Sequence, residues 1–154
     1  MDGLYDRDFL LWSEAEAEKL RRLRAGERVN DVDWENLIEE VEALGRSELK
    51  ATESLLYRAV EHLLKVMAWP ASRYRDQWMD EAFNLLSDAE SAFTPAMRQR
   101  SSVEAIYGRA LRDVRRKPSD GEPPGPLPPG PWFTLDDLLD ENVSPMDLIA
   151  RAPR

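Results

Sequence analysis

Five carboxylates have the spacing expected of side chains that could hold a metal ion. Glu35, Glu39 and Glu42 follow one another at four- and three-residue intervals, so they would line one side of a helix. Asp76 and Asp80 are four residues apart on a later predicted helix. Carboxylate oxygens are ligands that Mg²⁺ and Mn²⁺ accept. These residues therefore indicate one alternative function, a metal-dependent hydrolase.

The detailed pattern argues against that hydrolase. All-helical phosphohydrolases of nucleotides use a pair of glutamates with a third glutamate three residues later. Here Ala43 stands at the third position after Glu39-Glu40. A solvated acidic face that pairs with arginine is the favoured interpretation, because surface glutamate is common on helices. We assign no catalytic residue, no metal and no cofactor.

The only histidine, His62, could act as a general base. A di-metal carboxylate bundle needs a Glu-x-x-His motif, and Ala59 occupies the position of that glutamate. Arg73 and Trp78 form a basic-aromatic cluster that could hold a phosphate or stack a base. A structural histidine at the margin of a packed helix, and arginines that cover core aromatic rings, are the more common arrangements.

The segment Gly45-Arg46-Ser47-Glu48 interrupts an amphipathic helix. At 100° per residue the apolar positions keep the same phase on both sides of Gly45, which predicts one helix and no break. Gly45, Glu48 and Thr52 would then face inward. We interpret Gly45 as a point where another helix backbone comes close, so that Gly45→Leu would disrupt packing and Gly45→Ala would be mild. Glu48 and Thr52 would form a small buried polar patch.

Several chemistries are excluded by missing motifs. The chain has no Gly-rich phosphate loop, nucleophile elbow, His-Glu-x-x-His motif or dinucleotide fingerprint. It has no Cys, which excludes disulfides and thiolate zinc sites. No stretch approaches the roughly 20 apolar residues that span a bilayer, and no signal peptide pattern opens the chain. We therefore expect a cytoplasmic protein without a membrane partner.

The charge distribution also bears on the choice of partner. The net charge of −9 argues against general binding to nucleic acid, whose phosphates require basic neutralisation. Residues 98–117 are an exception, with seven basic and two acidic side chains. This segment could dock nucleic acid, but solvation or pairing with acidic helices is the more common outcome for such a run.

The elements that must position these residues are helical almost throughout, with no alternating strand pattern. The predicted helices cover about residues 6–24, 33–69, 72–93 and 95–117, with Gly26 and Pro70 as stop signals and Asp33 as an N-cap. We expect an all-α bundle of about four main helices with one long central helix. Residues 1–117 form the predicted bundle domain, 118–133 a Pro-rich connector, and 134–154 a short helix and tail that dock on the bundle.

The quoted helices carry a family resemblance. The stretches YDRDFLLW, DWENLIEEVEALGRSE, LLYRAVEHLLK and TLDDLLDEN resemble, in the same order, the bacterial Domain of Unknown Function family 29. The resemblance implies an all-helical fold and supplies no established activity, substrate or catalytic residue. The chain differs from the family at Glu16, where the family often has Gln, and at Val66, where it often has Trp. Its Pro-rich connector is also long.

Three functions are consistent with these features. The favoured one is a non-enzymatic helical interaction module, whose partner is a second copy or another protein, because the chain combines a long apolar stripe, five Trp and opposed charge blocks. The metal-dependent hydrolase is an alternative. A nucleic-acid-associated regulator that uses residues 98–117 is the third.

Overall fold

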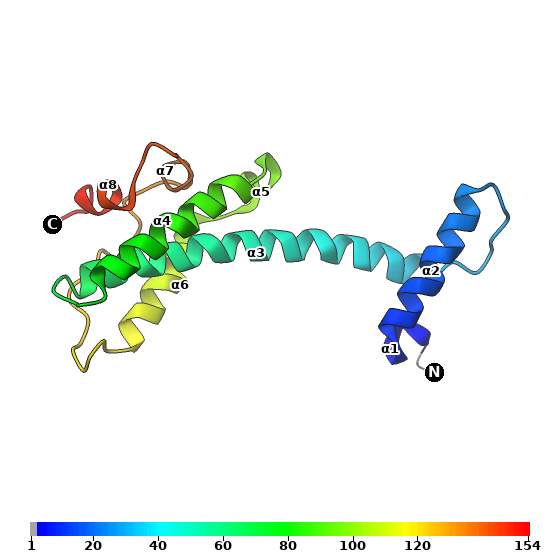
Figure 1. Cartoon of the computed structure of the whole chain (residues 1–154), viewed down its shortest axis with the longest axis horizontal. Helices are drawn as coiled ribbons and strands as arrows, with labels where there is room; N and C mark the ends of the chain where they lie inside the picture. Colours follow the sequence, from blue (N-terminus) through cyan, green and yellow to red (C-terminus); the bar gives the residue numbers. More distant parts are fainter. Residues whose placement is uncertain (1–2) are drawn as a thin grey trace. The chain divides into compact units, whose positions relative to one another are not determined.

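The computed structural model describes residues 3–154, and these residues form eight helices and no strand. Figure 1 labels the helices in chain order. The chain forms two compact units, Met1–Glu48 and Leu49–Arg154, which we call the N-terminal unit and the C-terminal unit. The predicted all-α class is confirmed. The division falls inside the predicted 1–117 domain, because residues up to Glu48 make most of their contacts among themselves.

The N-terminal unit contains α1 (Leu4–Arg7), α2 (Phe9–Arg24) and the first part of α3 (Trp34–Ala68). Where the sequence predicted one helix from about residue 6, the chain breaks at Asp8. The Asp8 carboxylate accepts a hydrogen bond from the Leu11 amide at 3.0 Å and so begins a new helix. The predicted stop is confirmed: Gly26 has a φ of +89°, a left-handed conformation that ends helices.

Helix α3 contains 35 residues and runs through Gly45 without interruption, as the constant phase of its apolar positions predicted. It ends two residues before Pro70. Residues up to Glu48 belong to the N-terminal unit and those from Leu49 to the C-terminal unit.

The C-terminal unit adds α4 (Arg75–Ala92), α5 (Pro95–Arg100), α6 (Val103–Arg116), α7 (Leu135–Leu138) and α8 (Pro145–Ala150). The predicted helix over 95–117 is two helices. Ser101 adopts an extended conformation, and the Ser102 hydroxyl accepts from the Ala105 amide at 3.2 Å, so one helix ends where the next is capped. The helix predicted from residue 72 begins at Arg75, because residues 70–74 form turns after Pro70.

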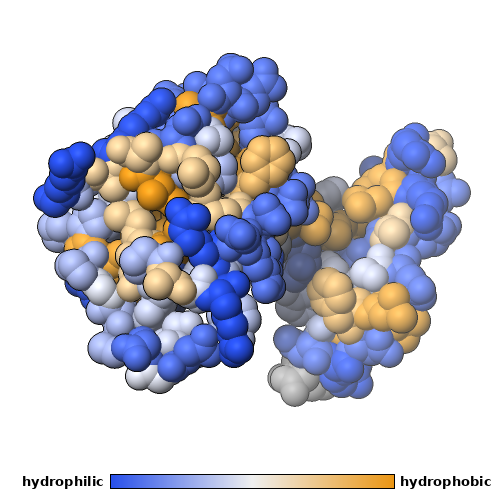
Figure 2. Space-filling model, turned by 60° about the vertical axis from the view of Figure 1, so that its left-hand side comes forward, coloured by the Kyte–Doolittle hydropathy of each residue, from blue (hydrophilic) through white to orange (hydrophobic). Residues whose placement is uncertain are grey.

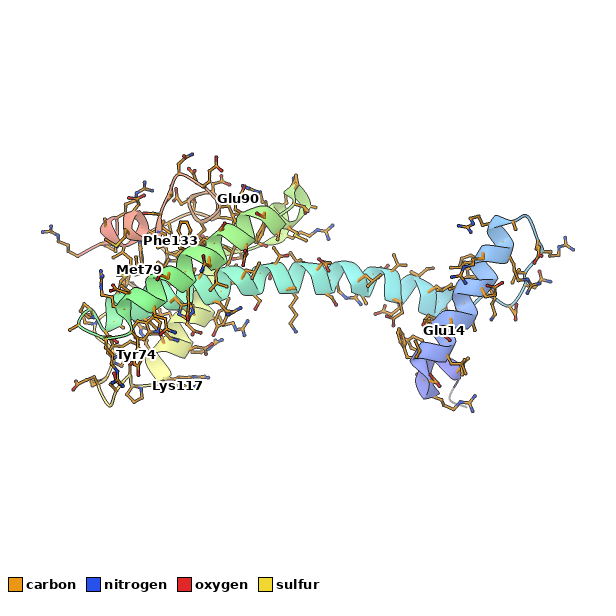
Figure 3. All side chains as sticks on the ribbon, in the orientation of Figure 1. Glu14, Tyr74, Met79, Glu90, Lys117 and Phe133 are labelled. Atoms are coloured by element: carbon orange, nitrogen blue, oxygen red, sulfur yellow. The ribbon has the colours of Figure 1, made fainter. Side chains whose placement is uncertain are left out.

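The core lies in the C-terminal unit, where residues of α3, α4 and α6 pack with residues of the tail. Phe133, labelled in Figure 3, and Leu148 are buried in this core, so the tail docks on the helices of its own unit. The Pro-rich connector is also packed: the Gly125 amide donates to the Ala68 carbonyl at 2.9 Å. A Cβ at Gly125 would lie 3.1 Å from that carbonyl oxygen, so a larger residue would fit only if the backbone shifted by a few tenths of an ångström.

Candidate functional site

Exposed apolar side chains are concentrated in the N-terminal unit. Of ten exposed large hydrophobic residues in the described chain, eight lie between Phe9 and Leu44. Six of these side chains share one groove between α2 and α3, and we call them the N-terminal apolar face: Phe9, Leu20, Trp34, Ile38, Val41 and Leu44. Orange, hydrophobic side chains are visible on the N-terminal unit at the right of Figure 2.

The groove consists of two adjoining hollows with volumes of about 270 and 390 Å³. The first lies between the Phe9 end of α2 and Leu44 of α3, and the second between Leu20 and Trp34. Leu20, Leu37 and Val41 line both hollows, which makes the groove continuous. Its lining is almost entirely apolar, which is the character of a surface that binds another apolar surface.

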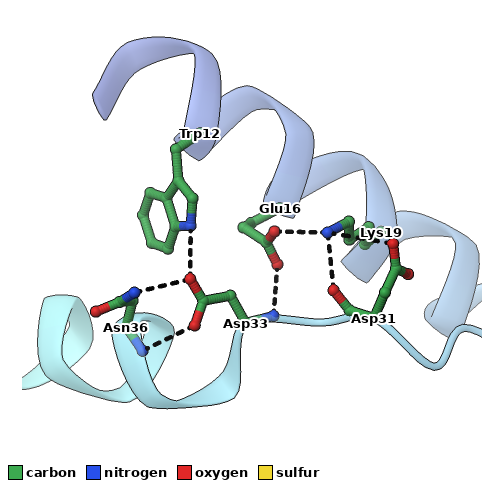
Figure 4. Close-up of polar contacts among 6 residues, drawn as sticks. All are labelled: Trp12, Glu16, Lys19, Asp31, Asp33 and Asn36. Atoms are coloured by element: carbon green, nitrogen blue, oxygen red, sulfur yellow. Dashed lines mark hydrogen bonds and ion pairs between the residues drawn. The ribbon is translucent and has the colours of Figure 1, made fainter. Parts of the chain in front are cut away.

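Polar contacts hold α2 against the start of α3 (Figure 4). The Trp12 indole N–H donates to the Asp33 carboxylate at 3.0 Å, and the Glu16 carboxylate accepts from the Asp33 amide at 2.9 Å. Glu16 also pairs with Lys19 at 2.8 Å. Trp12 and Glu16 are the buried residues of α2. Because α2 uses this side to contact α3, Phe9 and Leu20 are left beside the contact and exposed.

Asp33 is the cap that the sequence predicted for α3. Its carboxylate accepts from the Asn36 side chain at 2.8 Å and, with a longer bond of 3.5 Å, from the Asn36 backbone amide. These bonds and the Trp12 indole hold the pKa of Asp33 below its usual range, against an opposing effect of burial. The group therefore remains a carboxylate that orients both helices.

The first half of the α3 stripe is exposed, and the sequence had placed it inward. Trp34, Ile38, Val41 and Leu44 are 55%, 57%, 67% and 68% exposed. The same stripe is buried from Leu56 onward. The periodicity specifies an apolar face and does not say what covers it. No motif in the sequence distinguishes the covered part of the stripe from the exposed part.

The prediction of a close approach at Gly45 within the chain is wrong. Gly45 is exposed, and a Cβ added there would meet no residue of the described range 3–154 within 4 Å, apart from its own helix backbone. Glu48 is exposed as well, so the predicted buried polar patch is reduced to Thr52, which is 4% exposed. The contact point expected from the sequence is therefore open to solvent.

The predicted metal ligands do not form a site in the part of the chain that the structure describes. Within residues 3–154, no group of three or more His, Asp or Glu side chains is placed to hold a metal ion. Glu35, Asp76 and Asp80 are exposed. The other two candidates pair with an arginine of their own helix, Arg46, whose guanidinium lies 2.6 Å from Glu39 and 3.7 Å from Glu42.

Arg73 and Trp78, the predicted basic-aromatic cluster, make contacts within the C-terminal unit. The Arg73 guanidinium lies 3.3 Å from the Asp120 carboxylate and 4.8 Å from the centroid of the Tyr74 ring. Trp78 is partly buried, 6.1 Å from the Trp69 ring by centroids, and lines a surface cavity of about 520 Å³. The basic segment 98–117 also makes a contact within the C-terminal unit, since the Arg98 guanidinium lies 3.2 Å from the Asp136 carboxylate.

His62 links α3 to α4, because its Nε2 lies 2.9 Å from a carboxylate oxygen of Glu81. Its Nδ1 is buried and has no hydrogen-bond partner among the described residues. The neutral imidazole can donate its Nε2–H to Glu81 and leave Nδ1 without a proton. Protonation of Nδ1 would instead bury an N–H group that has no acceptor, which is unfavourable. Burial, with a contribution from Lys65, lowers the pKa of His62, although Glu81 opposes the shift. This geometry favours a structural role.

A pH-dependence follows from this lowered pKa. His62 takes up its proton near pH 6.5 in the unfolded chain and only at a lower pH in the folded chain. The contribution of the neutral His62 to the free energy of unfolding is therefore fully present above about pH 6.5, and it is lost as the pH falls from about 6.5 through the lowered pKa of the folded chain. The slope is at most about 1.4 kcal/mol per pH unit for one proton. Urea unfolding between pH 7.5 and 5 measures it, and His62→Gln is expected to flatten it. Identical slopes in the two proteins would contradict the assignment.

The structure defines an all-α protein with an uncovered apolar face on its N-terminal helices. No helix among residues 3–154 is both long and apolar enough to cross a membrane. The family model described as Domain of unknown function DUF29 matches residues 4–144, and the chain belongs to this family. This identity confirms the resemblance seen in the sequence.

A solved structure with the same fold comes from Rhodospirillum rubrum. It is described as an alpha-helical protein of unknown function, determined at 1.45 Å resolution. It is 26% identical to this chain, with a TM-score of 0.68, and the match covers 99% of this chain and 100% of that chain. No curated protein matches this chain.

Proposed function

We propose that this protein is a non-enzymatic helical interaction module that binds a protein chain through its N-terminal apolar face. The observation that carries the proposal is the concentration of eight of the ten exposed large hydrophobic side chains of the described chain in this one small unit. Scattered exposed apolar residues are ordinary, whereas a continuous apolar groove marks a binding surface.

The size of the N-terminal unit explains why the face is uncovered. A segment of fewer than 50 residues with two main helices can bury one seam between them, and Trp12 and Glu16 take most of that seam. At their observed exposures the six side chains of the face present on the order of 100 Å² each, about 600 Å² in total. Covering this area by a partner is favourable by the hydrophobic effect.

Site-specific photo-crosslinking in the native cell tests the proposal. A photoreactive phenylalanine analogue at Ile38 is expected to give covalent adducts with protein, because a partner lies against that side chain. The matched control is the same analogue at Met146, which is 58% exposed, compared with 57% for Ile38, and lies in the C-terminal unit. Absence of adducts at Ile38, or equal labelling at both positions, would refute the proposed function.

A further inference from the structure

Four positions of α3 form a narrow exposed line. Trp34, Ile38, Val41 and Gly45 follow one another at intervals of four, three and four residues. At 100° per residue they lie within about 60° of one another around the helix. The three side chains are 55–67% exposed, and Gly45 has open space above its Cα. This is the spacing of a helix that packs lengthwise against another helix.

The spacing reads the same in both directions along the chain. An antiparallel copy of the same helix would therefore place Trp34 opposite the second copy's Gly45, and Ile38 opposite the second copy's Val41. The largest side chain of the line would lie over the residue without a side chain, and two medium-sized β-branched residues would meet between them. Alternating large and small residues in this way is what close helix packing requires.

A parallel pairing does not have this complementarity. It would place Trp34 against Trp34 and Gly45 against Gly45, which crowds one end of the line and leaves a void at the other. A two-fold axis between Glu39 and Glu40 is therefore the arrangement in which the surface complements itself. Symmetric pairing of this type uses the same patch on both subunits, which closes the assembly at two copies.

We propose that the N-terminal apolar face is the interface of a homodimer in which the α3 helices of two copies pair antiparallel, with Trp34 packed over Gly45. The proposal rests on the proposed function, since it names the partner of the same face. It also explains the glycine that interrupts the stripe. Gly45 is the close-contact point of a helix pair formed between chains.

The area available matches what a stable dimer needs. A standard interface buries about 800 Å² per partner, of which roughly two-thirds is apolar in homodimers, or about 500 Å². The N-terminal apolar face offers about 600 Å². Phe9 and Leu20 of α2 border the groove next to the α3 line and extend the contact surface beyond one helix.

Sedimentation equilibrium of the full chain tests the dimer. We expect twice the 17.7 kDa chain mass at concentrations of about 1–300 µM. Ile38→Glu and Val41→Glu are each expected to raise the dissociation constant at least about 30-fold. Met146→Glu is the matched control and should leave it unchanged, since Met146 and Ile38 are equally exposed. Gly45→Leu should also weaken the dimer while leaving the helicity of the chain intact.

Single cysteines test the register, because the chain has no native Cys. An oxidised mixture of Trp34→Cys and Gly45→Cys proteins is expected to form a disulfide-linked dimer. Each variant alone should crosslink poorly, because in this register two copies of the same residue are displaced by eleven positions, about 16 Å along the axis. Crosslinking by each variant alone, with no disulfide between the two different variants in the mixture, would indicate parallel helices and overturn the register.

A strict monomer over this concentration range, or a dimer that Ile38→Glu and Val41→Glu leave unchanged, would overturn the homodimer. The photo-crosslinking experiment separates this failure from failure of the proposed function. If the adducts at position 38 contain a different protein, the proposed function as an interaction module stands, but the proposal that a second copy is the partner fails. Adducts at twice the chain mass would agree with the dimer.

Discussion

Tyr107→Ala is expected to lower the free energy of unfolding of the C-terminal unit by about 3–5 kcal/mol, the usual cost of removing a large buried aromatic side chain. Tyr107 is 1% exposed and is among the largest fully buried side chains of the described chain. Its ring packs edge-on against Trp132 and Phe133, with centroids 6.0 and 5.9 Å away. The variant leaves a cavity where α6 meets the segment that leads into α7.

The hydroxyl of Tyr107 adds a second contribution. It donates to the Pro128 carbonyl at 2.5 Å and so ties the Pro-rich connector to α6. Burial raises the pKa of Tyr107 to about 12, so the group remains a donor at neutral pH. Tyr107→Phe keeps the ring and loses this bond, with an expected cost of about 1–2 kcal/mol.

Urea unfolding followed by circular dichroism measures both Tyr107 variants. Phe83→Ala is the matched control, because Phe83 belongs to the same unit and is 59% exposed. Its expected effect is within about 0.5 kcal/mol. A Tyr107→Ala protein as stable as the Phe83→Ala protein would show that the core does not depend on this residue.

Glu16→Ala is expected to destabilise the packing of α2 on α3 by about 2–4 kcal/mol, because it removes one partner of a buried pair. The Glu16 side chain is 4% exposed and serves two donors, Lys19 and the Asp33 amide. Alanine leaves that amide without its acceptor. In this variant Lys19 keeps its hydrogen bond to the Asp31 carbonyl at 2.8 Å, and its side chain is 24% exposed to water. The loss of stability is therefore smaller than for a fully buried, unpaired lysine.

Amide hydrogen exchange measures this effect, because it reports on α2 separately from the C-terminal unit. Exchange of the central α2 amides is expected to accelerate at least about 30-fold, the equivalent of 2 kcal/mol. Glu18→Ala is the control on the same helix, since Glu18 is 63% exposed and pairs with an exposed arginine. Equal exchange rates in the two variants would mean that the Glu16 pair does not hold α2 in place.

Much of the secondary structure could be predicted from local chemistry. The Asp33 cap and the stop at Gly26 depend on residues adjacent in the chain. The breaks at Asp8 and Ser101-Ser102 have local causes too, but short helix breaks compete closely with continued helix, so the pattern of apolar residues did not reveal them.

The candidate site was harder to predict. The sequence singled out Gly45 as a contact point, but it could not say that a Cβ there would have none of the described residues packed against it. The carboxylates Glu39 and Glu42 had suitable spacing for a metal, yet their helix also carries Arg46 within reach. The exposure of Phe9 and Leu20 beside the buried Trp12 and Glu16 is likewise decided by how α2 packs on α3.

By itself the sequence determined the helical class, the family, the Asp33 cap and the single apolar stripe along α3, because each depends on residue type and on spacing along one helix. Only the tertiary structure decided which half of that stripe is buried. From Leu56 onward the stripe packs with α4, α6 and the tail, whereas among the described residues Trp34, Ile38, Val41 and Leu44 border a groove with α2 and stay exposed. Burial depends on how many elements surround a face, and periodicity carries no information about that number.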